Sequence, residues 1–502
     1  MRRIPSCASA LLLTACTVLP APARPPAPLM TRAALRSGFD SLIADPMFRN
    51  TNWGVLVVEP LTGDTIYSHG AGKLFMPASN QKILTGATAL AQLGPEYRFT
   101  TDFVSSAPVV DSVLRGDLVV FGRGDPSVSD AMMGDAMKPL RAAAESLWAR
   151  GVREIAGALV KGGNAFPDTT VGFGWEWDDF ETTSGAAVDE LFFNEGFARV
   201  TVFGGARPGD SVRVRTAPAR TVPVVLANFV TDAATGSTAA GERQARAPLQ
   251  WTTDMRGARP VVHLAGSVGP GDSLSAQVAL RDPASAWLDA FAEALRERGI
   301  RVRGNVIRAP VATVPDRPRL FSLSSPPLRE ILPPFLKPSQ NQIGELLFHA
   351  LGLERTGVGS ADSGRRVVER QLVAWGADTA GFAVRDGSGL TRHDYVTPET
   401  IVKVLDAMRT HESFRVFYDA LPVAGVDGTI ATRMRGTPAQ GNVHAKTGTV
   451  DKARSLSGYV TTADGRVLLF SILCNNFTVA NREVERVQDA MLVGLAGAPL
   501  PR

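Results

Sequence analysis

Three short motifs constrain this chain more than any other feature of its sequence. They occur once each and in a fixed order: S-x-x-K from Ser79 to Lys82, S-x-N from Ser339 to Asn341, and K-T-G from Lys446 to Gly448, followed by Thr449. The flanking residues predict a helix start for the first, a loop beside a helix for the second and a strand for the third. Only one of the eight lysines follows a serine by three positions, so coincidence is a poor explanation for the set.

The spacing of the first motif has a chemical reason. Residues three apart share one face of a helix, so Lys82 is expected beside the hydroxyl of Ser79. A serine hydroxyl is a weak nucleophile that needs an adjacent base, and a lysine can serve if burial and neighbouring cations lower its pKa. Lys446, from a strand across the cleft, could supply that positive field or bind a substrate carboxylate. Backbone N–H groups at the helix start could stabilise an oxyanion.

The length and charge of the chain limit the number of its domains and the kind of its partners. A chain of 502 residues is too long for one typical compact domain, which favours two or three. Apolar residues make up 44% of it, an ordinary globular share. The formal net charge is only +4, so the composition gives no case for a nucleic-acid partner.

The first residues are typical of a secretory signal. Arg2 and Arg3 precede the apolar run from Ala8 to Leu19, which is too short to span a bilayer. Two endings stay open: a signal peptide over residues 1–23, or a lipoprotein signal that ends before a lipidated Cys16. Either predicts export to the periplasm or cell envelope, with membrane attachment only if Cys16 is lipidated.

The cysteines indicate no disulfide framework. Cys7 and Cys16 lie in the predicted signal, which leaves Cys474 alone in an apolar strand. We interpret Cys474 as a small core residue rather than a nucleophile.

Periodicity and composition divide the mature chain. Residues 24–100 and 280–502 are predicted to form one domain, with helices over 31–47, from Ser79 onward and over 479–495, and with the K-T-G strand paired to apolar strands. Residues 101–279 hold short β-like runs separated by Gly and Pro. We expect them to form one or two inserted, mostly β accessory domains.

The chain resembles the D-alanyl-D-alanine carboxypeptidase/endopeptidases, the class C low-molecular-mass penicillin-binding proteins. The resemblance covers nearly all of the mature chain. It implies an α/β (α+β) fold of the serine β-lactamase/transpeptidase type, carrying a large, mostly β insertion. One departure is Ser184, which stands where the family usually has a tyrosine; another is Phe197, which follows Gly196 where the family has an Asn-x-Val pattern. The matching segments are Met76–Thr85, Gly122–Pro126, Trp175–Asp179, Phe193–Glu195, Lys337–Asn341, Asp386–Arg392 and His444–Thr449.

The resemblance also implies the catalytic roles. Ser79 would form the acyl-enzyme and Lys82 would take its proton. Ser339 would relay a proton to the leaving D-alanine, Asn341 would hold the substrate amide, and Lys446 would support Ser339 electrostatically.

Substrate binding is carried over to the third motif. Thr447, Gly448 and Thr449 would hold the substrate, with the two threonines on its terminal carboxylate and acyl segment. The N–H groups of Ser79 and Thr449 would form the oxyanion hole. The implied activity is a serine-type D-Ala-D-Ala carboxypeptidase, with DD-endopeptidase activity left open. Its partners would be peptidoglycan stem peptides and, as inhibitors, β-lactams, with no cofactor.

Two other functions stay open: a serine β-lactamase, and a non-catalytic peptidoglycan-binding protein. The six histidines show no close paired spacing, so no metal site is expected. Turn chemistry explains Asp386 and Ser388 in their Gly-rich loop, although a cleft-lining role is an open alternative. Trp175 and Trp177 are expected to fill the core rather than to stack on sugars.

Overall fold

The computed structural model describes residues 31–499, apart from residue 106 and residues 219–223, 232–249, 255–260 and 312–318. The predicted signal sequence, its two alternative endings and Cys16 lie outside the described residues. No described helix combines the length and apolar character that a bilayer-spanning segment needs.

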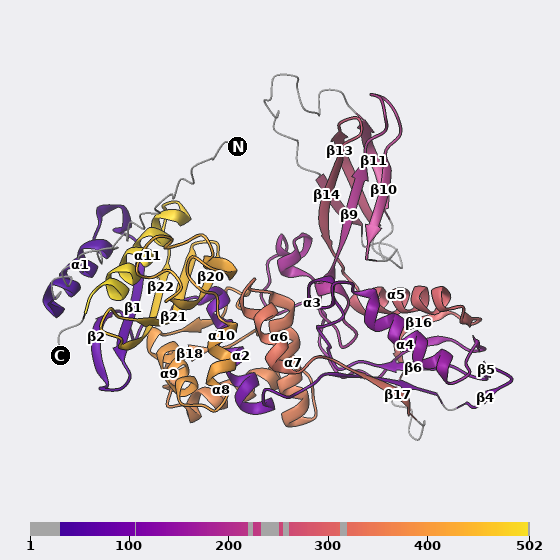
Figure 1. The fold of residues 1–502 in the computed structure, drawn as a ribbon, viewed down its shortest axis with the longest axis horizontal. Coiled ribbons are helices and arrows are strands. Elements are labelled where there is room, and N and C mark those ends of the chain that lie inside the picture. The colour runs from indigo at the N-terminus through magenta and orange to yellow at the C-terminus, as the bar shows by residue number, and fades with distance from the viewer. Residues whose placement is uncertain are drawn as a thin grey trace, which may run out of the picture.

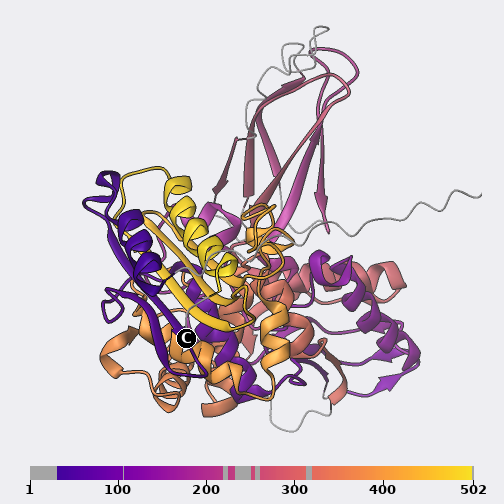
Figure 2. The same cartoon turned by 60° about the vertical axis from the view of Figure 1, so that its left-hand side comes forward.

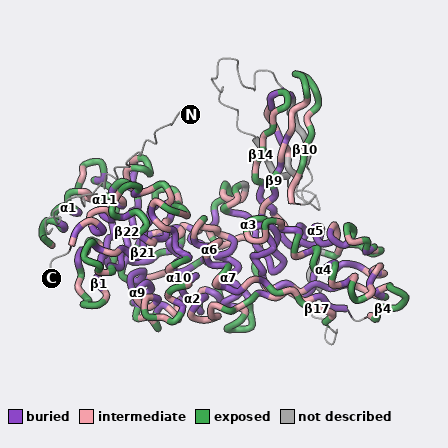
Figure 3. Tube along the Cα trace, viewed as in Figure 1, coloured by how far each residue is buried: buried purple, intermediate pink, exposed green. Residues whose placement is uncertain are grey.

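One antiparallel sheet forms the centre of the part that carries the motifs. Its strand order is β2 (Asp64–His69), β1 (Asn52–Glu59), β22 (Val467–Asn475), β21 (Ala453–Thr461) and β20 (His444–Val450). Strands β21 and β22 are buried along almost their whole length (Figure 3). Such continuous burial requires that both faces of the sheet are covered.

Helices from the two ends of the chain cover one face of this sheet. Helix α1 (Arg32–Ile43) contributes Leu35 and Phe39, and α11 (Asn481–Gly497) contributes Met491 to the same core. Cys474 is fully buried there as a free thiol, which confirms its interpretation as a core residue. Figure 1 shows both helices beside β1 and β22.

A group of helices covers the opposite face. It contains α2 (Gln81–Leu93), α6 (Leu328–Leu336), α7 (Asn341–Thr356), α8 (Ala361–Ala374), α9 (Pro398–Arg409) and α10 (Phe414–Ala420). Side chains cap the starts of α8 and α9, where Ser360 and Thr397 accept the N–H of Ser363 and Thr400. The short strands β18 (Phe382–Ala383) and β19 (Tyr395–Val396) pair and frame the loop between them.

The inserted region leaves and returns through neighbouring strands. Strands β3 (Thr100–Val104) and β17 (Arg319–Ser324) pair at one side of a second sheet, whose other members are β6 (Leu118–Phe121), β8 (Leu159–Gly162) and β16 (Val306–Val311). A small sheet joins β4 (Val109–Val110), β5 (Val113–Leu114), β7 (Glu154–Ile155) and β15 (Arg301–Val302).

The structure differs from the sequence expectation in where this region ends and in what it contains. Helices α4 (Met137–Ala149) and α5 (Pro283–Arg298) pack together there, and the aromatic rings of Trp287 and Phe291 contact Phe103. Helix α5 and strands β15, β16 and β17 therefore lie with the sheets of the inserted region, beyond the expected boundary at residue 279. An amphipathic pattern shows that α5 buries one face, but not against which core.

Two three-stranded sheets project from the inserted region (Figures 1 and 2). The first has the order β10 (Arg213–Ala217), β9 (Phe197–Phe203) and β14 (Ser273–Ala279). The second has the order β11 (Val224–Thr231), β13 (Val261–Val268) and β12 (Gln250–Asp254).

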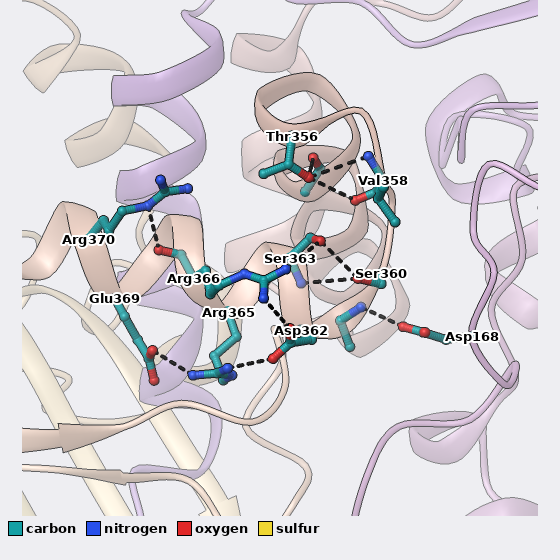
Figure 4. A network of polar contacts seen from close by, with 12 residues as sticks. Asp168, Thr356, Val358, Ser360, Asp362, Ser363, Arg365, Arg366, Glu369 and Arg370 are labelled. Carbon is teal, nitrogen blue, oxygen red and sulfur yellow. Dashed lines mark hydrogen bonds and ion pairs between the residues drawn. The ribbon is translucent and has the colours of Figure 1, made fainter.

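The inserted region is tied directly to the helical group. Figure 4 shows Asp168 at the start of α8, where its carboxylate accepts the backbone N–H of Ala361 at 2.5 Å. Around it, Arg365 pairs with Asp362 and Glu369 on the same helix. The segment that follows Asp168 runs on to the residues of the candidate site.

Candidate active site

Ser79 lies in a 3-10 turn, Ala78–Asn80, directly ahead of α2. A hydrogen bond to strand β20 holds this turn in place, because the side-chain amide of Asn80 donates to the carbonyl of Lys446 at 2.8 Å. Ala78 has a φ of 48°, an uncommon left-handed conformation for a residue with a Cβ. The chain thus presents the serine on a sharp, externally supported bend.

Lys82 lies one turn later and is fully buried. Its Nζ contacts three acceptors: Ser79 Oγ at 2.8 Å, Asn341 Oδ1 at 2.6 Å and the carbonyl of Ser388 at 2.8 Å. The structure therefore brings together the first two motifs and the loop between β18 and β19 around one amine.

The surroundings of Lys82 favour the neutral amine near neutral pH. Burial is the main cause and lowers the pKa of Lys82 to about 7, while the nearby carboxyls of Asp386, Glu345 and Asp394 oppose it. Two of these carboxyls are themselves affected: burial raises the pKa of Glu345 to about 8 and that of Asp394 well above its usual range. A lysine with a pKa near the working pH meets the main requirement for a general base.

Lys446 is also fully buried, and its Nζ donates to the carbonyl of Thr447 at 3.0 Å. Burial, reinforced by the charge of Lys82, lowers the pKa of Lys446 well below its ordinary value. The positive field that the sequence suggested for Lys446 is therefore not favoured by these surroundings alone, since burial lowers the pKa of both lysines. A bound carboxylate is the kind of partner that would restore its charge.

A cavity of about 280 Å³ opens over these residues. Five of the predicted site residues line it, whereas the other three, Lys82, Lys446 and Gly448, are buried. Ser339 has a φ of 67°, so the second motif also has an uncommon backbone conformation at the cavity. The lining residues are Ser79, Ser184, Pro338, Ser339, Asn341, Gly389, Leu390, Thr429, Thr447, Thr449 and Val450.

Gly448 is required by a close approach between strand and turn. A Cβ at this position would lie 2.0 Å from Ser455 Oγ, 2.5 Å from the carbonyl of Pro77 and 3.0 Å from the N of Ser79. Ser455 Oγ itself donates to the Pro77 carbonyl at 2.6 Å. Only a glycine lets β20 lie this close to the turn that carries the serine.

Asn341 is engaged by protein partners on both sides of its amide. Its Oδ1 accepts from Lys82, and its Nδ2 donates to the backbone carbonyl of Ser184 at 3.0 Å. The neighbouring Gln342 donates to the carbonyls of Thr183, Ser184 and Ala186. Asn341 thus orients the lysine. The departure at Ser184 leaves these contacts intact because they use the backbone.

The sequence did not reveal how several residues of the site act. Ser388 acts through its carbonyl, which any residue type provides. Thr429, from the 3-10 turn Gly428–Ile430, lies 2.7 Å from Thr447 Oγ1 and belongs to no motif. Trp175 is buried as expected, but its indole N–H also bonds to Asp386, whereas Trp177 is 83% exposed and fills no core.

Other parts of the described chain offer less chemistry. A larger cavity of about 490 Å³ lies beside β18 and β19 and is lined partly by Phe173, Arg385 and His393, but it holds no serine–lysine pair. His444 stacks on Tyr418 at 3.9 Å between ring centroids, which is a packing role. Among the residues that the structure describes, no group of His, Cys, Asp or Glu is arranged to hold a metal ion.

One protein family matches almost the whole chain. The model of the D-Ala-D-Ala carboxypeptidase 3 (S13) family matches residues 35–497. The D-alanyl-D-alanine carboxypeptidase of Actinomadura sp. (strain R39) is 34% identical over 478 residues, which cover 92% of this chain and 84% of that protein. The D-alanyl-D-alanine carboxypeptidase DacB of Haemophilus influenzae is 25% identical, covering 86% and 87%.

Solved structures agree on the fold. The crystal structure of penicillin binding protein 4 (dacB) from Haemophilus influenzae aligns with a TM-score of 0.76 at 23% identity, covering 92% of this chain and 97% of that one. The same protein complexed with a β-lactam aligns with a TM-score of 0.70. The expected α/β fold class is confirmed.

Proposed function

The chain belongs to the D-Ala-D-Ala carboxypeptidase 3 (S13) family and is a D-Ala-D-Ala carboxypeptidase, and on that premise we propose that it acts through an acyl-enzyme on Ser79. The observation that carries the proposal is the 2.8 Å contact between Lys82 Nζ and Ser79 Oγ at a cavity also lined by Ser339, Thr447 and Thr449. A nucleophile within hydrogen-bond reach of a buried base is the arrangement that activated serines use.

In the acylation step, neutral Lys82 takes the hydroxyl proton of Ser79 while the oxygen attacks the carbonyl carbon of the penultimate D-alanine. The tetrahedral oxyanion would be held by the backbone N–H groups of Ser79 and Thr449. As the peptide bond breaks, Ser339 passes its proton to the amine of the leaving D-alanine and takes in return the proton that Lys82 received, so that Ser339 is a neutral hydroxyl and Lys82 a neutral amine again. Water then adds to the ester, and the stem peptide leaves with a new carboxylate while Ser79 regains its proton.

The free carboxylate of the substrate is the natural ligand for the K-T-G side of the cavity. Thr447 and Thr449 line it with hydroxyl groups, and the buried Lys446 amine donates to the carbonyl of Thr447. A carboxylate placed there would favour protonated Lys446 and would give the buried charge a partner. Binding of the substrate terminus would thus offset the burial that lowers the pKa of Lys446.

The natural substrate is proposed to be the peptidoglycan stem peptide that ends in D-Ala-D-Ala. A β-lactam would acylate the same serine, and its ring would open as the acyl–oxygen bond forms. The D-alanyl-D-alanine carboxypeptidase relatives and the β-lactam complex of the Haemophilus influenzae protein support this assignment.

Incubation with a fluorescent penicillin and with a D-Ala-D-Ala peptide tests the proposal. Persistent labelling together with release of free D-alanine is expected, and both should disappear in Ser79→Ala. Rapid turnover of the label without D-alanine release would indicate a β-lactamase instead. No labelling at all would indicate a non-catalytic binding protein. Release of monomers from a cross-linked muropeptide dimer, measured in parallel, would add endopeptidase activity.

We further propose that the protein is exported to the periplasm or cell envelope. The support is the pair Arg2 and Arg3 before the apolar run from Ala8 to Leu19. Fractionation of cells expressing the full chain tests this, and metabolic labelling with a fatty acid tests lipidation. Incorporation that Cys16→Ala abolishes would show a lipid anchor, whereas a mature N-terminus after residue 23 would show cleavage.

A further inference from the structure

The contacts of Lys82 determine where its lone pair points. Asn341 Oδ1 and the Ser388 carbonyl lie 2.6 and 2.8 Å from Nζ. Neither of these oxygens carries a proton, so both can only accept. The amide of Asn341 is held in this orientation because its Nδ2 donates to the Ser184 carbonyl.

A neutral lysine amine has two N–H groups and one lone pair. If both N–H groups are taken by Asn341 and Ser388, the lone pair is left for the third neighbour, Ser79 Oγ, which lies at 2.8 Å and carries the proton to be removed. The two acceptors thus select the rotamer of the amine in which Lys82 can act as a base. Without one of these two acceptors the amine of Lys82 could rotate, and its lone pair would no longer be directed at Ser79 Oγ.

The Ser388 carbonyl is positioned by the carboxylate of Asp386. One oxygen of Asp386 accepts the N–H of Ser388 and of Gly389, at 3.2 and 2.6 Å. The other accepts the N–H of Thr391 at 2.8 Å and the indole N–H of Trp175 at 3.1 Å. Three of the four donors lie in the loop itself and move with it. Trp175 alone among them comes from elsewhere in the chain.

Trp175 belongs to a segment of the inserted region that is anchored at both ends. Upstream, Asp168 holds the start of α8 (Figure 4). Downstream, the Ser184 carbonyl holds Asn341. Both acceptors of the lysine amine are therefore connected to this one segment. Gly387, in the same loop, is also hydrogen-bonded to Thr85 of α2 and to Glu345 of α7. The bond from Trp175 therefore adds a contact between this loop and the inserted region.

We propose that Trp175 is a positioning residue for acylation: its bond to Asp386 keeps the Ser388 carbonyl where it directs the lone pair of Lys82 toward Ser79. The inference rests on the proposed function, because it assigns a task to a residue that does not line the catalytic cavity. It also gives the inserted region a part in the chemistry. Preorganised supporting residues of this kind fix a reacting group without touching the substrate.

The test is single-turnover acylation of Trp175→Phe by a fluorescent penicillin over a range of pH. Phenylalanine keeps an aromatic ring in the buried site and removes the N–H donor. The acylation rate constant per active molecule is expected to fall by at least roughly tenfold, as misorientation of a reacting group does. The fraction of molecules that finally become labelled should stay near that of the parent.

The pH midpoint separates positioning from a change in charge. The ionisable groups that face Lys82 are Asp386, Glu345, Asp394 and Lys446. Trp175→Phe removes none of these charges, although it takes one hydrogen bond from Asp386, so the pH midpoint of the acylation rate should move far less than in Asp386→Asn while the plateau falls. In the Asp386→Asn background the tryptophan substitution should have little further effect, because residues acting through one contact are not additive.

Trp287→Phe is the matched control, since it makes the same change in the buried core of the inserted region. It should lower the melting temperature without changing the rate per labelled molecule. An unchanged plateau in Trp175→Phe, or an equal loss in the parent and Asp386→Asn backgrounds, would overturn the inference. A parent protein that never becomes labelled would instead refute the proposed function, so the two failures are distinguishable.

Discussion

Lys82 Nζ lies 2.8 Å from Ser79 Oγ, and the lysine side chain that makes this contact is fully buried. The same amine reaches the S-x-N motif through Asn341. Burial removes competing water from the amine and lowers its pKa to about 7, so a stable cation is converted into a base close to neutral pH.

Replacing Lys82 by arginine should remove this base while it keeps a positive charge. Arginine does not deprotonate in proteins, so acylation by penicillin should fall by about 10²- to 10⁴-fold. Stopped-flow labelling measures the rate, and the melting temperature checks the fold. The matched control is Lys446→Arg, which should retain more of the rate and lose mainly substrate affinity. Near-parental acylation in Lys82→Arg would mean that another group is the base.

The acylation rate should rise with pH through a midpoint near 7. Below that pH, Lys82 is an ammonium group without a lone pair; above it, the neutral amine can accept the serine proton. Asp386→Asn removes a carboxylate whose charge raises the pKa of Lys82, so its midpoint should move to lower pH. A rate profile that is flat from pH 5 to 9 would contradict this account of the base.

Gly448→Ala should separate the strand from the nucleophile turn. Its Cβ would lie 2.0 Å from Ser455 Oγ and 2.5 Å from the Pro77 carbonyl. Overpacking of this kind costs about 1–3 kcal/mol of stability, and acylation should fall as well. The control is Gly38→Ala in α1, where nothing lies within 4 Å; it should stabilise the helix by about 0.5–1 kcal/mol. Denaturant unfolding and labelling measure both. Equal behaviour of the two variants would refute the proposed close fit.

Cys474 should report on unfolding rather than on catalysis. It is fully buried in β22, and burial raises the pKa of its thiol well above the usual range. In a Cys7→Ser/Cys16→Ser protein, a thiol reagent should react only after denaturant is added, because the reactive thiolate is absent from the folded chain. Rapid reaction of the native protein, with loss of penicillin labelling, would instead place Cys474 near the site.

Sequence patterns anticipated the fold class and much of the local structure. The helix after Ser79 and the strand that carries Lys446 could be inferred because periodicity and motif spacing are local properties. The end of the insertion could not, since the long-range pairing of β3 with β17 decides it. The same holds for α5, whose apolar face gives no sign of which core it joins.

The candidate site likewise combines residues that could be inferred from the sequence with contacts that could not. The residues of the three motifs could be named from the sequence, and their roles remain proposals. The contacts that orient Lys82 could not be inferred, because the carbonyls of Ser388 and Ser184 belong to the backbone. Nor did the motifs reveal that Lys446 lacks a carboxylate among its described contacts; that depends on which side chains the fold packs around it.

Peptide mapping of the penicillin-treated protein tests the central claim most directly. Intact-mass spectrometry should show one covalent adduct per molecule. Digestion should place that adduct on Ser79, in the peptide that also contains Lys82. Ser79→Ala should carry no adduct while it keeps the melting temperature of the parent, because the change removes a single hydroxyl from a cavity wall. An adduct on any other residue, or one that persists in Ser79→Ala, would contradict the account.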